Sequence, residues 1–200
     1  MPKQKYHKYV FDEKTRKFIG DFETMYREED RQGYDSWFQE DLTCLSKRVS
    51  SLIVNQHKFK SILDIGCGKG VFTNTLKKAG NAVVGIDISR TAIIKAKARY
   101  RSSKFFVSDI EPVLNRRKMW DLVVMMDLLS YIKSWKNVLA AASRRAQYLY
   151  ISLWLPQRPR GFVKSLDELR LQVERYFDIE TLLLWNHDHI FILAKNKKEV

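Results

Sequence analysis

The sequence predicts one α/β domain built on a seven-stranded sheet that is parallel except for its last strand. The length of 200 residues is that of a single domain. From residue 61 onward, short apolar runs alternate with segments of helical periodicity, and a tight polar turn joins the last two runs. Strands that alternate with helices form a parallel sheet covered on both faces. We therefore expect a helical cap over residues 1–60 and a sheet core over 61–195.

Seven apolar runs are the predicted strands, at 62–65, 82–86, 105–107, 122–126, 148–153, 179–185 and 190–194. Helices are expected at 42–53, 71–79, 90–100, 128–146 and 166–176, where apolar residues recur at helical spacing. Residues 1–40 are polar, rich in aromatic residues and expected to be irregular. The connection Asn186–His189 is too short for a crossover, so the last strand is expected to run antiparallel to the one before it.

The net charge is the unusual feature of the composition. Lys and Arg outnumber Asp and Glu by 36 to 23, which gives +13. Such a charge informs about partners rather than about the fold. Two interpretations stay open: an anionic substrate or nucleic acid, and solvated helix faces and tails.

Compartment and membrane association are also constrained. No apolar run approaches the roughly 20 residues of a membrane span, and the first residues lack the apolar stretch of a secretory signal. The two cysteines, Cys44 and Cys67, give no disulfide framework. We therefore expect a cytoplasmic protein without a membrane span.

A glycine-rich loop follows the first predicted strand. The segment from Asp64 to Gly70 reads Asp-Ile-Gly-Cys-Gly-Lys-Gly and leads into a predicted helix. The dinucleotide fingerprint G-x-G-x-x-G would need glycine where Val71 stands, and no P-loop string occurs. Because the carboxylate of Asp64 suits a cationic ligand better than a phosphate, a pyrophosphate ligand is disfavoured.

Acidic residues follow the next three predicted strands. Asp87 lies about 20 residues beyond the loop, at the distance expected of an acid that accepts ribose hydroxyls. Asp109 and Asp127 end the third and fourth strands. Ligands of open α/β sheets bind at the carboxyl ends of the strands, so these acids are expected to gather at one site.

Residues 62–127 resemble the successive motifs of class I S-adenosylmethionine-dependent methyltransferases, which have a Rossmann-like, doubly wound fold. The resemblance implies S-adenosyl-L-methionine as the cofactor. It implies that Asp64 and the loop hold the methionine portion, that Asp87 binds the ribose, and that Ile88 packs on adenine. It also implies that Asp109 and the Ile110 backbone face the adenine amino group, and that Asp127 faces the sulfonium and the acceptor. The implied loop contacts are Gly66, Cys67, Gly68 and Gly70.

Candidates for the acceptor side come from two further segments. His187 or His189, with Asp188 nearby, could act as a base, although a polar hairpin turn explains the same residues. No other Cys or His clusters with them, so no metal site is expected. Tyr34 and Trp37 resemble the lid aromatics of small-molecule methyltransferases, and ordinary packing is the alternative.

The expected function is methyl transfer to the oxygen or nitrogen of a small molecule, such as a saccharide or another anionic metabolite. An RNA methyltransferase is the second hypothesis, because the chain is basic and its first residues mix lysines with aromatics. The residues after Asp127 lack the Pro-Pro-aromatic string of amino-directed nucleic-acid enzymes. The third hypothesis is a non-catalytic partner subunit, against which the intact loop and acids argue.

Overall fold

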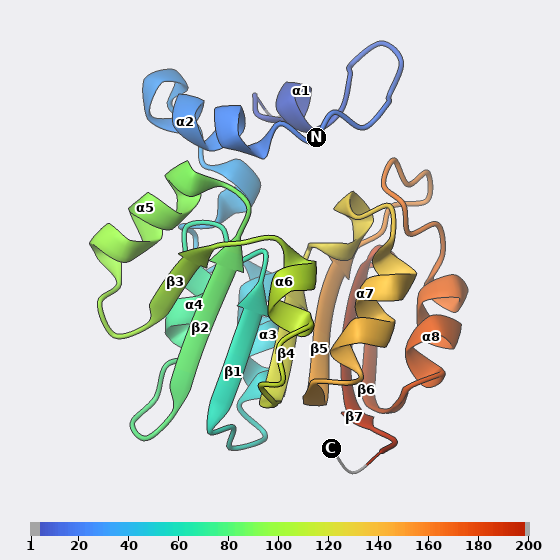
Figure 1. Cartoon of the computed structure of the whole chain (residues 1–200). Helices are drawn as coiled ribbons and strands as arrows, with labels where there is room; N and C mark the ends of the chain where they lie inside the picture. The colour runs from blue at the N-terminus through green and yellow to red at the C-terminus, as the bar shows by residue number, and fades with distance from the viewer. Residues whose placement is uncertain (1–4, 199–200) are drawn as a thin grey trace.

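A seven-stranded sheet runs through the molecule in the order β3-β2-β1-β4-β5-β7-β6 (Figure 1). The strands are β1 Ser61–Ile65, β2 Ala82–Asp87, β3 Lys104–Val107, β4 Trp120–Met126, β5 Ala146–Trp154, β6 Phe177–Trp185 and β7 His189–Asn196. The computed structural model describes residues 5–198, so residues 1–4 of the expected cap lie outside it. Only β7 runs against the others, since it is antiparallel to both β5 and β6. The predicted fold class is confirmed.

The strand order places the functional edge of the sheet. From β1 the chain moves outward to β2 and β3, and then returns to the other side of β1 to form β4 and β5. Strand order therefore reverses at β1, which pairs in parallel with both β2 and β4. The connections that follow the strands on either side of such a reversal run to opposite faces of the sheet, and the crevice between them leaves room for a ligand.

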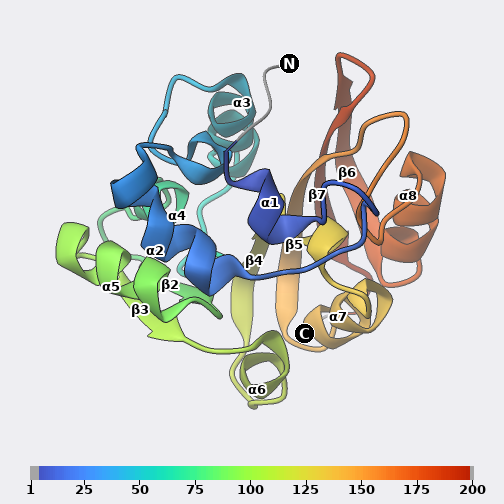
Figure 2. The same ribbon diagram turned by 90° about the horizontal axis from the view of Figure 1, so that it is seen from above.

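Helices cover both faces of this sheet (Figures 1 and 2). Apolar side chains of α3 (Leu45–Val54) and α4 (Val71–Thr75) pack on one face. Those of α6 (Ile110–Leu114), α7 (Trp135–Ala142) and α8 (Leu166–Glu174) pack on the other. The remaining core helix, α5 (Arg90–Arg99), lies against β2 and β3.

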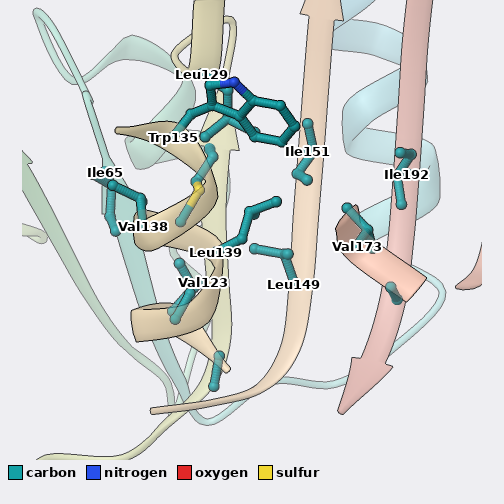
Figure 3. Packing of buried hydrophobic residues seen from close by; sticks show 14 of the residues in the cluster. Ile65, Val123, Leu129, Trp135, Val138, Leu139, Leu149, Ile151, Val173 and Ile192 are labelled. Atoms are coloured by element: carbon teal, nitrogen blue, oxygen red, sulfur yellow. The ribbon is translucent and has the colours of Figure 1, made fainter. Parts of the chain in front are cut away.

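The larger core lies between the sheet and α7 (Figure 3). Trp135 and Leu139 of this helix are buried against Val123, Leu149 and Ile151 of the central strands. In a parallel sheet both faces are covered, and the strands accordingly consist of nearly continuous apolar runs. Burial of each such side chain contributes roughly 1.5–3 kcal/mol, which makes the central strands the rigid support of the site at their ends.

The cap corrects one expectation. Residues 1–40 were expected to be irregular, yet they contain α1 (His7–Val10), α2 (Phe22–Gln32) and the 3-10 turn Ser36–Phe38. The Asp21 carboxylate caps α2 by accepting from the Thr24 amide at 3.1 Å. Charged residues occur on the core side of α2 as well as on its exposed side: Glu23 and Glu29 bond to residues of the core, whereas Glu28 pairs with Arg31 of the same helix.

Several element boundaries also differ from the expected ones. The helix expected at 71–79 ends at Thr75. The helix expected at 128–146 is divided into a 3-10 turn, Leu129–Tyr131, and α7, because Ile132 between them is extended. The short helix α6 was not expected at all. The 3-10 turn and the start of α6 lie at the ligand edge, where Tyr131 and Ile110 line the cavity described below.

Two glycines with positive φ provide a matched test of packing in the loop. Gly70 (φ +75°) and Gly80 (φ +83°) share the left-handed conformation, but a Cβ on Gly70 would lie 2.6 Å from the Phe105 ring, whereas Gly80 has open space. We expect Gly80→Ala to lower the free energy of unfolding by about 1 kcal/mol through backbone strain. Gly70→Ala should cost about 2 kcal/mol more, because it also overpacks the core.

Urea unfolding of the two variants measures this difference. Equal losses would show that the space around Gly70 relaxes freely and that only its φ matters.

Candidate active site

A cavity of about 380 Å³ lies between the carboxyl ends of β1–β4 and the cap. The predicted site residues that line it are Asp64, Gly66, Cys67, Asp87, Ile88, Asp109, Ile110, Asp127 and Trp37. Gly68 and Gly70 belong to the same loop but are not among the lining residues. Tyr34, His187 and His189 are also outside the lining. The residues after four separate strands thus meet in one place, as the strand-end argument predicts.

Two carboxylates with raised pKa values line this cavity, Asp64 buried and Asp87 partly buried. Asp64 accepts a hydrogen bond from the Thr73 hydroxyl at 2.6 Å. Asp87 accepts from the backbone amides of Gly68 at 2.9 Å and Ser89 at 2.8 Å, which fixes the glycine loop against the end of β2.

Burial makes both carboxylates harder to ionise. Desolvation raises the pKa of Asp64 to about 7; the Thr73 hydrogen bond opposes this shift and the charge of Asp87 adds to it. Desolvation also raises the pKa of Asp87, although the amides of Ser89 and Gly68 stabilise its ionised form. A cationic group in the cavity would favour the ionised form of both. The site is therefore suited to a ligand that carries positive charge.

Lys69, which the sequence analysis did not single out, ties the cap to the glycine loop. Its buried ammonium group lies 2.7 Å from Asp35 and 3.3 Å from both Glu29 and Glu40, all three in the cap. Burial alone lowers the pKa of Lys69, but the hydrogen bond to Asp35 and the three negative charges raise it above its usual value. Its backbone amide also donates to the side chain of Gln39 at 2.8 Å. In the sequence, only the position of Lys69 between two loop glycines marks this residue as part of the site.

Aromatic side chains close the cavity from the cap side. Phe22, Tyr26 and Trp37 line it together with Tyr131 of the 3-10 turn after β4. The Trp37 indole donates to the Tyr131 hydroxyl at 3.0 Å and so joins the cap to the core. Tyr34 lies elsewhere in the cap, where its hydroxyl donates to the Met25 carbonyl at 2.7 Å. Tyr131 and Phe22 were missed because their spacing in the sequence is that of ordinary core residues.

One acceptor-side candidate, His189, lies beside Asp127. This residue has φ +49°, an uncommon conformation that concentrates at functional sites. Its Oδ1 accepts from the Trp154 amide at 2.9 Å and lies 3.9 Å from His189 Nε2. That nitrogen is buried and has no hydrogen-bond partner in the structure. His187 lies in the hairpin turn, and Asp188 accepts from the Trp154 indole at 2.9 Å.

Two kinds of feature are absent from residues 5–198. No helix among them is both long and apolar enough to span a bilayer. No three His, Cys, Asp or Glu side chains in that range are grouped as metal ligands would be.

The family follows from comparison with known proteins. The family model described as a methyltransferase domain matches residues 34–191, which is most of the chain. The chain therefore belongs to this methyltransferase-domain family. The resemblance to class I S-adenosylmethionine-dependent methyltransferases is confirmed.

Individual proteins share only part of the sequence or a low identity with this chain. The ubiquinone biosynthesis O-methyltransferase of Coxiella burnetii is 32% identical over 79 residues, which is 38% of this chain and 34% of that protein. The chain thus spans about a third of the length of this relative. Two solved structures share the fold. The N-methyltransferase NodS of Bradyrhizobium japonicum, in complex with S-adenosyl-L-homocysteine, has a TM-score of 0.67 at 17% identity. The match covers 86% of this chain and 98% of the NodS chain. The magnesium protoporphyrin IX methyltransferase of Synechocystis has a TM-score of 0.63 at 17% identity. Its match covers 87% of this chain and 96% of that protein's chain.

The raised pKa of Asp64 predicts a specific pH dependence of stability. Between the unfolded value of 3.8 and the folded value of about 7, the folded protein keeps a proton that the unfolded chain has lost. The free energy of unfolding, measured relative to Asp64→Asn, should therefore fall by up to about 1.4 kcal/mol per pH unit as the pH rises through this range, and level off above it.

Urea unfolding at a series of pH values, without ligand, checks this. The surface variant Asp178→Asn serves as the control for a lost carboxylate. Parallel pH curves for wild type and Asp64→Asn would contradict the assignment.

Proposed function

We propose that this protein transfers a methyl group from S-adenosyl-L-methionine to an oxygen or nitrogen atom of a small molecule. The observation that carries the proposal is the pair of cavity carboxylates, buried Asp64 and partly buried Asp87, beside the glycine loop at the strand reversal. Membership of the methyltransferase-domain family supports it.

The lining residues fit the parts of this cofactor. Asp64 would face its ammonium group, and ionised Asp87, held by two loop amides, would accept the ribose hydroxyls. The exposed side chain of Ile88 offers an apolar surface to the adenine ring, next to Asp109 and Ile110. When bound, S-adenosyl-L-methionine supplies a methyl group on a sulfonium, and the sulfur keeps the electron pair of the broken bond.

Substitution of Asp87 tests the cofactor assignment. Asp87→Asn keeps the size of the side chain but removes the charge that accepts two hydroxyls. We expect it to weaken the binding of S-adenosyl-L-homocysteine by at least about tenfold, since charge-assisted hydrogen bonds are each worth roughly 1.5–3 kcal/mol. Calorimetric titration measures this, with NAD as the ligand control.

Asp167→Asn, an exposed position on α8, is the matched control. An affinity in Asp87→Asn equal to that of the control would refute the ribose contact. No binding of either S-adenosyl compound to the wild type would refute the cofactor itself and would favour a non-catalytic partner subunit.

At the acceptor end of the cavity, the chain's own residues handle a proton. Asp127 lines the cavity and orients the acceptor's hydroxyl or amine by accepting its hydrogen. His189, which is outside the cavity lining and 3.9 Å from the same carboxylate, receives that proton through Asp127 when the new bond to the methyl carbon forms. The resulting imidazolium is neutralised by Asp127. The separation is longer than a hydrogen bond, but such contacts often tighten only in the complex.

Water is kept from the reacting atoms by the aromatic closure. Trp37, Tyr131 and Phe22 surround the acceptor end of the cavity and present mostly apolar surface to it. Because nucleophile and sulfonium react by direct displacement, alignment and the exclusion of water supply much of the rate.

The two histidines of the hairpin give a matched pair of variants. We expect His189→Asn to lower kcat about 100-fold, the scale of general base catalysis, without changing cofactor affinity. His187→Asn should leave kcat within about twofold, because His187 is in the turn and its φ of +62° is one that asparagine tolerates. Transfer of a labelled methyl group to acceptors found by screening measures both.

A similar loss of kcat in both variants would assign the effect to the turn as a whole. A wild-type rate in His189→Asn would return the histidine to a structural role.

The anionic acceptor is a further hypothesis. Arg158 and Arg160 follow β5 and are both exposed, and neither lines the cavity. A screen of acceptors should therefore include matched charged and uncharged compounds, and RNA at several salt concentrations. Salt-sensitive methylation of RNA would favour the second hypothesis from the sequence.

A further inference from the structure

Two tryptophans flank His189 on one face of the sheet. In the register of the antiparallel strands, Trp154 of β5 pairs with His189 of β7, and His189 pairs with Trp185 of β6. Residues directly opposite one another in antiparallel strands share a face. The three side chains therefore form a row across three strands. Leu183, two residues before Trp185, extends it on the same face.

This row is an unusually apolar surface. Trp154 is 44% exposed, Trp185 46% and Leu183 40%. The Trp154 indole is held in place by its hydrogen bond to Asp188 at 2.9 Å, so its ring is oriented while its face is free. Ordered, half-exposed aromatic rings are typical of binding surfaces, because they offer a large contact area at little cost in conformational entropy.

The row is continuous with the cavity. The backbone amide of Trp154 donates to Asp127, which lines the cavity, and His189 lies beside the same carboxylate. If the reactive atom of an acceptor lies at Asp127, the remainder of the acceptor molecule can contact the row.

A second copy of the chain, paired along the edge strand β6, explains the row less well. Leu182 and Leu184 are equally exposed on the opposite face of β6, as expected of an edge. The exposed Trp154, however, lies on β5, separated from that edge by β7. An edge-to-edge contact would leave this indole uncovered.

We propose that the row Trp154, His189, Trp185 and Leu183 binds the hydrophobic body of the methyl acceptor. This rests on the proposed function and names its substrate class: a hydroxyl or amine carried on an apolar ring system or alkyl chain. Neighbouring strands are about 4.8 Å apart, so the row is roughly 10 Å wide across three strands. That is the extent of two joined rings or of a medium-length alkyl chain.

The experiment uses two phenols that differ only in alkyl length. Calorimetry on the protein saturated with S-adenosyl-L-homocysteine compares 4-hexylphenol with 4-ethylphenol. We expect wild type to bind the hexyl compound at least about tenfold more tightly, because each buried methylene adds to the affinity.

The edge strand itself supplies matched variants. The doubly substituted Leu183→Ser/Trp185→Ser protein changes the face of the row, and Leu182→Ser/Leu184→Ser changes the opposite face of the same strand. The first should lose the preference for the hexyl compound, and the second should keep it. Both should bind S-adenosyl-L-homocysteine as wild type does.

Three outcomes would overturn the inference. One is a wild type without preference between the phenols, and another is an equal loss of preference in both variants. The third is a wild-type dimer, seen by sedimentation, that both variants convert to monomers, since this would make β6 an interface between copies. Failure of the wild type to bind S-adenosyl-L-homocysteine would instead refute the proposed function, and the inference with it.

Discussion

The contact between Lys69 and the cap carboxylates organises the rest of the site. A buried ammonium group is costly unless it is paired, and here three carboxylates from the cap surround it. Glu29 is itself buried and also accepts from the Ser36 amide at 2.9 Å. The same Glu29 lies 3.2 Å from Lys95 of α5. A cap that moved away would leave these charges unpaired, so the ion-pair cluster fixes where the cap aromatics stand over the cavity.

This arrangement also determines the electrostatics of the cavity. Lys69 is part of the glycine loop, and its charge would otherwise offset the neighbouring Asp64 and Asp87. The cap carboxylates pair with this ammonium group, while desolvation raises the pKa values of the two cavity carboxylates, whose ionised forms a cation would stabilise. The glycine loop thus lies beside two acidic side chains of the strand ends, and its own lysine is paired with the cap.

Much of the core was predictable from the sequence, and the reason is physical. Strands such as Ile62–Ile65 and Leu122–Met126 are continuous apolar runs, because both faces are buried, and the acids at their ends mark the ligand edge. The cap was not predictable in the same way. Its order depends on contacts over long sequence separations, such as Lys69 with Asp35 and Trp37 with Tyr131. No local periodicity records such contacts, and α2 carries charged residues such as Glu29 on the side that meets the core as well as on its exposed side.

The net charge of the chain and the charge of its site have opposite signs. The chain is strongly basic, at +13, yet the cavity is lined by four aspartates against two lysines. One of these, Lys47, already donates to the backbone carbonyls of Phe38 and Asp41. A phosphate-rich acceptor would therefore meet repulsion at the reacting end, whereas an uncharged acceptor would not. The apolar row beside His189 offers such an acceptor a binding surface without charge. The other lysines and arginines of the described residues lie outside the cavity lining, so the basic character of the chain does not extend to the site.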